Sequence, residues 1–434
     1  MYDIVIIGAG LAGLTCAYQL QKKHPSLRVL IVEAKSVIGG RVLTDRTFAS
    51  CPIELGAEFV HGSRNLLHQM AEEFGIPLQS IFTWAQGDGG PSPHLISGKG
   101  GYYYLNKEKK LLRFDDPDLD FTHANQIIQD LDTDEEIKPD ETVYQYLESR
   151  VSPRMISLLH AGFGNTLCSD LRWLPLQETK DLLEQFEEDE GEFINRHGWD
   201  TLLYHLRNKV DIQLHWPVSR IHWKPQHVVI ESESGQTIHA SRVVLTPSVS
   251  VMKRLSFHPR LPLEKRDMFH RIRMESCIKI IFSFSSSFGP DDLHGLICDD
   301  GPVPEWWKKQ TEHETIWMGF ATSSFANTLH SFSREALQKA LLVQLDTIFG
   351  TSSDPTPATD RFLSWMVQDW THDPYCGGGY SSPTPGEDRS ILAKPVCDTL
   401  FFAGEATETK YMVMHAAIQS GIRVAHELEQ KSKL

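Results

Sequence analysis

The sequence has no hydrophobic run long enough to cross a membrane. Its apolar stretches all fall short of the roughly 18 uninterrupted residues that a spanning helix needs. The first ten residues, MYDIVIIGAG, lack the basic segment that opens a secretory signal. We therefore expect a soluble globular chain with no membrane partner and no cleaved leader.

Paired cysteines are lacking as well. The seven cysteines are odd in number and widely spaced, with no CxxC motif and no Cys/His cluster. This pattern favours reduced thiols in an intracellular protein. Neither a disulfide framework nor a metal site is expected.

A basic excess is also absent, since the formal net charge is −15. This argues against nucleic-acid binding, which normally leaves a basic footprint. Residues 115–192 hold 21 Asp or Glu and five Lys or Arg, while the rest of the chain is nearly balanced. Two interpretations stay open: solvated helix faces, or a negative field that concentrates cations at a cavity entrance.

The 434 residues are enough for two or three domains with a buried core. Apolar patterning predicts a strand at 2–7, a helix at 11–21 and a strand at 28–33, which together make one β-α-β unit. Strand-like alternation returns at 210–247 and predicts a β-meander that leads back to the first sheet. Further predicted elements are strands at 277–284 and 399–406 and a helix at 415–428.

These elements predict an α/β fold with a Rossmann-type nucleotide-binding domain, made of a parallel sheet plus a β-meander. Insertions would divide it and form a discontinuous α+β substrate-binding domain. The predicted nucleotide-binding segments are 1–68, 194–256 and 388–434, and the predicted substrate-binding segments are 69–193 and 257–387.

The glycines of GAGLAG carry the nucleotide prediction, because they follow a strand and open a helix. Gly8 permits the tight turn, Gly10 lets the backbone approach a pyrophosphate, and Gly13 lets the helix pack closely on the strand. The helix N-terminus offers N–H groups and a positive dipole to phosphates. Glu33 ends the next strand, where an acid accepts the ribose hydroxyls.

Two further motifs favour FAD over NAD. Gly39-Gly40-Arg41 follows the second strand and offers a close backbone approach with a cation for the pyrophosphate. Near the C-terminus, Gly404-Glu405 would place a glycine turn and an acid against the ribityl or phosphate region.

With ELGAEFVHG, VVLTP, GGGYSSP and LFFAGEAT, these motifs span most of the chain. The sequence resembles the flavin amine oxidase family, which includes monoamine oxidases, polyamine oxidases and related histone demethylases. The resemblance implies an extended FAD held by Gly8, Gly10, Gly13, Glu33, Gly40, Arg41, Gly56, Ala57, Val218, Trp370, Gly404 and Glu405.

Lys279 interrupts an otherwise apolar stretch, Ile278 to Phe282, of the predicted strand at 277–284. A lysine there is costly unless its ammonium has a partner, or unless the strand lies at an edge and the side chain reaches solvent. The resemblance implies that Lys279 is catalytic and holds a water against the flavin.

The resemblance also implies the reaction: hydride transfer from an amine to flavin, hydrolysis of the imine, and reoxidation by oxygen to give hydrogen peroxide. Tyr380 matches one aromatic wall of the family's substrate cage. Monoamine oxidases carry a flavin-linked cysteine just before this tyrosine, whereas this chain has Gly379, so FAD is expected to bind non-covalently.

The second aromatic wall of the substrate cage matches the family's pattern less well. Val413 stands where many members carry an aromatic residue, and Tyr411 lies nearby, so the resemblance implies that both contact the substrate. His61 matches a histidine of animal polyamine oxidases, implying a catalytic role beside the flavin. Glu58 could pair with a substrate ammonium or with His61.

The favoured function is therefore oxidation of a polycationic amine: spermine, spermidine or an N-acetylated form. A monoamine or L-amino acid oxidase and a non-catalytic flavin-binding scaffold are the alternatives. The final residues, Ser432-Lys433-Leu434, match the peroxisomal S-K-L signal, which predicts a peroxisomal import receptor as partner.

Overall fold

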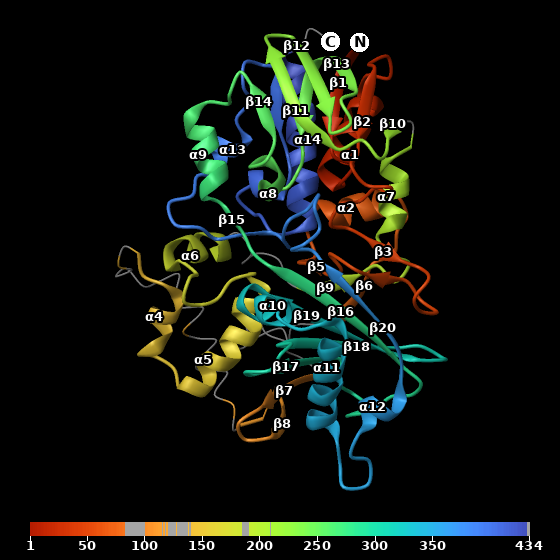
Figure 1. The fold of residues 1–434 in the computed structure, drawn as a ribbon, viewed down its shortest axis with the longest axis vertical. Coiled ribbons are helices and arrows are strands. Elements are labelled where there is room, and N and C mark those ends of the chain that lie inside the picture. The colour runs from red at the N-terminus through yellow and green to blue at the C-terminus, as the bar shows by residue number, and fades with distance from the viewer. Residues whose placement is uncertain are drawn as a thin grey trace.

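The computed structural model describes residues 1–82, 100–114, 116–117, 119, 127, 138, 140–184, 191–208 and 210–431. Two units lie one above the other in Figure 1, with both chain termini at the top. We call the upper one the nucleotide-binding unit and the lower one the substrate unit. Among the described residues, no helix combines the length and the apolar character needed to cross a membrane.

The nucleotide-binding unit is built on a sheet in the order β10-β2-β1-β13-β12-β11-β14, with β22 also paired to β13. The pairs β10–β2, β2–β1, β1–β13 and β13–β22 are parallel, and β13–β12–β11 is an antiparallel meander. The Rossmann-type sheet with a meander is thus confirmed. Its strands are β1 (Tyr2–Ile7), β2 (Val29–Val32), β10 (Asp211–Gln213), β11 (Val218–Lys224), β12 (His227–Ser232), β13 (Thr237–Leu245), β14 (Ser256–His258) and β22 (Leu400–Phe402). One detail differs from the prediction, because β10 pairs with β2 at the far edge of the sheet and is not part of the meander.

Helices cover both faces of this sheet. One core includes residues of α1 (Leu11–Lys23), α14 (Met414–Lys431), α2 (Leu66–Glu73) and α7 (Asp200–Leu206). The opposite core includes α8 (Val249–Met252), α9 (Leu263–Arg271) and α13 (Arg389–Ala393). The predicted domain boundaries at 68/69 and 256/257 therefore need correction. The first cuts through α2, and the second separates α9 from the core it packs into.

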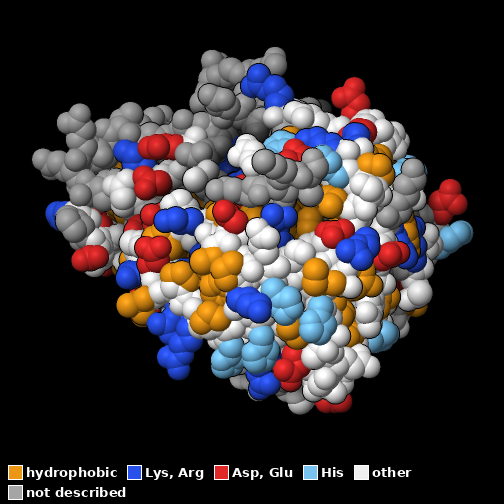
Figure 2. All heavy atoms as spheres, turned by 90° about the horizontal axis from the view of Figure 1, so that it is seen from above, with side chains coloured by type: hydrophobic (Ala, Val, Ile, Leu, Met, Phe, Trp, Pro, Cys, Tyr) orange, Lys and Arg blue, Asp and Glu red, His pale blue; other side chains and the backbone are white. Residues whose placement is uncertain are grey.

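The top face of this unit carries mixed charge. Figure 2 shows acidic and basic side chains interspersed on it, with histidines gathered in one area. Exposed histidines of the meander and its neighbour β14 include His222, His239 and His258.

The substrate unit is built on a second sheet in the order β20-β16-β19-β18-β17-β7-β8. These strands are β7 (Gly101–Leu105), β8 (Lys110–Arg113), β16 (Cys277–Phe284), β17 (Gly295–Cys298), β18 (Glu305–Gln310), β19 (Thr315–Thr322) and β20 (Phe362–Asp369). One core joins this sheet to α10 (Ser323–Leu329), α11 (Arg334–Phe349) and α12 (Pro357–Arg361). Strand β16 has the predicted bounds and lies inside the sheet, between β20 and β19. Its position excludes the alternative of an edge-strand lysine.

Smaller elements complete the fold. The helices α4 (Val143–Glu148), α5 (Pro153–Leu159) and α6 (Leu176–Glu184) pack around a separate core in the acidic segment, left of the sheet in Figure 1. A π-helical turn (His160–Gly164) continues α5, and a 3-10 turn (Glu405–Thr407) precedes α14. The short strands are β3 (Thr44–Asp45), β4 (Ile53–Glu54), β5 (Val60–His61), β6 (Gln79–Phe82), β9 (Glu192–Ile194), β15 (Arg273–Met274) and β21 (Ser381–Ser382).

Candidate active site

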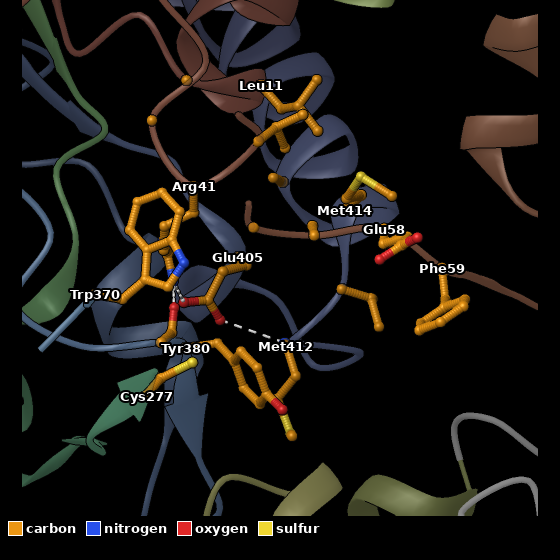
Figure 3. Close-up of a pocket in the computed structure, with 18 of the residues that line it drawn as sticks. Leu11, Arg41, Glu58, Phe59, Cys277, Trp370, Tyr380, Glu405, Met412 and Met414 are labelled. Atoms are coloured by element: carbon orange, nitrogen blue, oxygen red, sulfur yellow. Dashed lines mark hydrogen bonds and ion pairs between the residues drawn. The ribbon is translucent and has the colours of Figure 1, made fainter. Parts of the chain in front are cut away.

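A cavity of about 390 Å³ lies where the two units meet, and both contribute side chains to its wall. The start of α1 and the residues before α14 enter it from the nucleotide-binding unit. From the substrate unit it receives Cys277 and Lys279 of β16 and Glu305 and Trp307 of β18. Figure 3 shows labelled wall residues from both units around one space.

The glycine turn between β1 and α1 fits an anionic group. Gly8 has φ +106°, and a Cβ on Gly13 would lie 2.1 Å from the Gly8 carbonyl oxygen, so the close packing predicted for these glycines is present. A Cβ on Gly10 would meet nothing closer than 3.8 Å. The α1 N-terminus has no side-chain cap and no acid in its first turn. Its unpaired N–H groups are therefore left for a phosphate group.

Glu33 is fixed beside this turn. Its carboxylate accepts the backbone N–H of Ala9 at 2.7 Å and that of Lys35 at 2.9 Å, and only 7% of the residue is exposed. Glu33 lines the cavity, where its carboxylate can accept ribose hydroxyls.

Arg41 and Glu405 form an ion pair on the cavity wall, with Nη1 2.9 Å from Oε1. The same Arg41 nitrogen donates to the Gly379 carbonyl at 2.9 Å. Glu405 also accepts from the Ser381 hydroxyl at 2.7 Å and from the Met412 N–H at 3.3 Å. Although burial opposes it, Arg41 and Ser381 hold the pKa of Glu405 below its usual value. The pair thus connects segments far apart in sequence.

Most of the residues predicted to hold the cofactor lie on the wall. Gly13 and Val218 do not. Gly13 acts through helix packing, while Val218 starts β11 and packs against the core of the nucleotide-binding unit. Those on the wall are Gly8, Gly10, Glu33, Gly40, Arg41, Gly56, Ala57, Trp370, Gly404 and Glu405.

Lys279 projects from β16 into the cavity with 2% of its surface exposed. Its strand neighbours Ile278 and Ile280 pack in the core beneath α10 and α11, so alternation directs Lys279 to the other face. There its Nζ lies 2.7 Å from Glu58 Oε2 and 3.3 Å from the Gly56 carbonyl oxygen. Glu58 therefore pairs with Lys279, and not with His61 as one predicted alternative had it.

A group of aromatic rings lies beside this ammonium, with Trp307 in contact with it. The Trp307 ring centroid lies 5.0 Å from Lys279 Nζ and 5.3 Å from the centroid of Phe59. The Phe320 ring centroid lies 6.3 Å from that of Trp307, and all three rings line the cavity. Sequence reasoning did not identify this group, because its members come from three separate segments.

Tyr380 forms another wall. Its hydroxyl donates to the Thr166 carbonyl at 2.6 Å, just after the π-helical turn, which fixes the ring against the cavity. Tyr411, in contrast, does not line the cavity, and the prediction that it contacts substrate is corrected. The Tyr411 residue is 2% exposed and its ring lies 3.2 Å from the Arg389 guanidinium carbon. Met412, beside Tyr380 in Figure 3, and Val413 form this part of the wall.

His61 belongs to an acidic part of the cavity. Its Nδ1 lies 2.8 Å from Glu192 Oε1. Burial lowers the pKa of His61, but Glu192 and Glu305 outweigh this effect and raise it above the usual value. Glu192 is 8% exposed, and its other oxygen, Oε2, is buried with no hydrogen-bond partner among the described residues.

Glu305 is the second acid of this region. Burial raises its pKa to about 7, against the opposing effect of a 3.1 Å hydrogen bond from the Asn165 amide. Asn165 is itself held by Thr322, whose N–H donates to the Asn165 side-chain oxygen at 2.8 Å. The π-helical turn before Asn165 thus sets the orientation of Glu305.

Glu192 and Glu305 were missed at the sequence level. Glu192 stands at the end of an acid-rich run, and Glu305 begins a strand with no motif around it. The one available signal was alternation in β18, which places Glu305 and Trp307 on the same face.

Comparisons with known proteins agree on the class of the chain. The family model described as flavin containing amine oxidoreductase matches residues 11–428. Probable polyamine oxidase 4 of Arabidopsis thaliana is 23% identical over 99% of this chain and 87% of its own length. Lysine-specific histone demethylase 1 homolog 2 of Oryza sativa subsp. japonica is 27% identical over 99% of this chain, which spans 57% of that protein. The solved structure of cyclohexylamine oxidase from Brevibacterium oxydans IH-35A superposes with a TM-score of 0.79 at 21% identity, covering 99% of both chains.

Proposed function

The chain belongs to the flavin containing amine oxidoreductases, and we propose on that basis that it oxidises polyamines, namely spermine, spermidine or their N-acetylated forms. It is an amine oxidase with non-covalently bound FAD. Bound FAD takes up the hydride equivalent released from the α-carbon of the amine. We propose oxygen as the final acceptor and hydrogen peroxide as product.

The protein's own contribution is to bind, orient and desolvate the amine. Tyr380 and the ring group of Phe59, Trp307 and Phe320 provide apolar surfaces that exclude water and favour a cation. Lys279 provides a fixed N–H donor beside Gly56, one of the residues predicted to contact the cofactor.

One observation carries the choice of a polycation: the buried Glu192 and the half-buried Glu305 both line the cavity, and neither forms an ion pair with a described Lys or Arg. Glu192 Oε2 is buried without a hydrogen bond, which is costly unless a ligand supplies a donor. A second ammonium group of a polyamine would supply that donor. The curated polyamine oxidase relatives support the same choice.

An L-amino acid oxidase is less well supported, because it needs a cation for the substrate carboxylate. Each described Lys or Arg of the cavity wall already faces a protein carboxylate. These pairs are Lys35 with Asp373, Arg41 with Glu405 and Lys279 with Glu58. The placement of Lys279 and Tyr380 on the wall likewise favours an enzyme over a scaffold.

Peroxide release from a panel of free and acetylated polyamines, benzylamine-type monoamines and L-amino acids tests the proposal. Polyamines should react best. A charged hydrogen bond contributes about 1.5–3 kcal/mol, so Glu305→Gln should raise KM for a polyamine by about tenfold or more. The exposed Glu335→Gln on α11 is the matched control and should leave KM unchanged. A preference for monoamines or amino acids would contradict the assignment.

The same variant has a pH signature. Because burial raises the pKa of Glu305 to about 7, the anion is present above that pH and is lost as the pH falls through it. The ratio of the variant's KM to the wild-type KM for a polyamine should therefore grow from pH 6 to pH 8. A ratio that does not change with pH would mean that this carboxylate does not face the substrate.

A further inference from the structure

Three potential metal ligands meet outside the cavity, in the substrate unit. His330 caps the C-terminal end of α10, Asp369 ends β20, and His372 follows three residues later. None of the three lines the cavity. Their side chains nevertheless converge, and the ligand atoms all lie within 4.8 Å of one another.

The distances suit a single ion. Asp369 Oδ2 lies 2.7 Å from His372 Nδ1 and 3.1 Å from His330 Nε2. Atoms that each lie about 2.1 Å from a common zinc, at tetrahedral or octahedral angles, are about 3.0–3.4 Å apart. The two carboxylate–imidazole distances are thus close to those of ligands that share one ion, and all three ligand atoms lie within 4.8 Å of one another.

The carboxylate is oriented in advance. Asp369 Oδ1 accepts the backbone N–H groups of Thr371 at 3.0 Å and His372 at 3.1 Å, which leaves Oδ2 facing the two imidazoles. Burial opposes ionisation, but the hydrogen bonds from His372 and the nearby His330 lower the pKa of Asp369. The group is an anionic ligand at neutral pH, held by its surroundings as metal ligands commonly are.

His330 supplies an independent observation. Its Nε2 is buried and lies 3.1 Å from the carboxylate, yet it makes no hydrogen bond among the described residues. A buried polar atom without a hydrogen bond requires an explanation, and an ion is one of the few available. The His372 side chain is 68% exposed, so the cluster is open to solvent on one side.

We propose that His330, Asp369 and His372 bind a divalent ion of the zinc type. Two imidazole nitrogens and one carboxylate oxygen are the ligands that borderline cations such as Zn²⁺ prefer, and water can complete the coordination. No local sequence motif marks this set, because His330 lies 39 residues before Asp369 in the chain.

The ion would join α10 to the end of β20, next to the cavity wall. Trp370 follows Asp369 directly and lines the cavity, and the Cys277 N–H donates to the Thr371 hydroxyl at 2.9 Å. Binding should therefore stabilise the folded chain, since a ligand that binds only the native state raises its stability.

Calorimetric titration with ZnCl₂ tests the proposal, using the full FAD-loaded protein after dialysis against a chelator. One zinc should bind per chain. His372→Ala, His330→Ala and Asp369→Asn should each weaken binding at least tenfold, since even outer-shell changes cost 10–100-fold. Because His372 is exposed, its variant should fold and keep FAD.

His258→Ala is the matched control. His258 stacks on His222, which lies 3.7 Å from Glu231, but these groups do not converge as a metal site. Zinc should raise the thermal unfolding midpoint of the wild type and of this control, and not that of His372→Ala. Absence of zinc binding by the wild type, or equal binding by His372→Ala, would overturn the proposal.

Discussion

The ion pair of Lys279 and Glu58 joins the two units in the wall of the cavity where amine oxidation is expected. Glu58 precedes the β5 strand, and Lys279 lies on β16, an inner strand of the second sheet next to its edge strand β20. Both side chains are almost fully buried, at 3% and 11% exposed. Removing one partner of such a pair leaves an uncompensated charge, at a cost of about 3–5 kcal/mol.

Lys279→Met should slow amine oxidation at saturating substrate by at least about tenfold, because it removes the polar group that is positioned beside the cofactor site. FAD absorbance of the purified variant should remain. Stopped-flow reduction of the flavin by the best amine measures the effect. Lys309→Met is the matched control, because Lys309 also lies on an inner strand of this sheet but donates to the Pro52 carbonyl at 3.0 Å and does not line the cavity. Equal rates in both variants would make Lys279 a purely structural residue.

At the scale of elements, the turn between β1 and α1 separates two roles for glycine. A Cβ on Gly13 would collide with the backbone of Gly8, which no side-chain movement can relieve. A Cβ on Gly10 would have room in the protein alone but would stand where the predicted pyrophosphate approaches.

Gly13→Ala should lower the free energy of unfolding of the apoprotein by about 1–3 kcal/mol or more, as overpacking does. Gly10→Ala should leave that free energy within about 0.5 kcal/mol of the wild type and still weaken FAD binding. Urea unfolding and titration of the apoprotein with FAD measure the two effects. Wild-type FAD affinity in Gly10→Ala would contradict this division of roles.

The same elements show which parts of the fold and of the site can be predicted from the sequence. The strands predicted at 2–7 and 277–284 match β1 and β16, because a short apolar run between turns is typical of a buried strand. Motif spacing predicted that Glu33 and Arg41 face the cofactor site, since both follow the second strand of the β-α-β unit that begins with the glycine turn. Glu192, Glu305 and the partner of Glu58 depend on long-range packing, which no local pattern encodes.

At the scale of the whole molecule, we propose that the chain works in peroxisomes. Ser432-Lys433-Leu434 lie outside the described residues and follow α14 directly in the sequence. A fluorescent protein carrying the last dozen residues should enter peroxisomes of a eukaryotic cell, because the signal is read from the free end. Deleting Leu434 should abolish import. A diffuse signal from the intact tail would end this proposal.

Salt dependence distinguishes the two interpretations of the acidic segment, which are solvated helix faces and a field that steers cations. The segment's described helices, α4, α5 and α6, pack together beside the second sheet, while residues 185–190 lie outside the described residues. A field that steers polycations would weaken with salt, because the Debye length falls from about 30 Å at 0.01 M to about 8 Å at 0.15 M.

The burial of the cysteines affects how long such an enzyme can operate. Cys277 and Cys376 line the cavity in which peroxide would form. Burial raises the pKa of Cys277 to about 12 and that of Cys376 to about 11. The thiolate, and not the thiol, is the form that oxidants attack. At neutral pH these two sulfurs are almost wholly protonated, which protects both thiols against oxidation by the peroxide that we propose as the product.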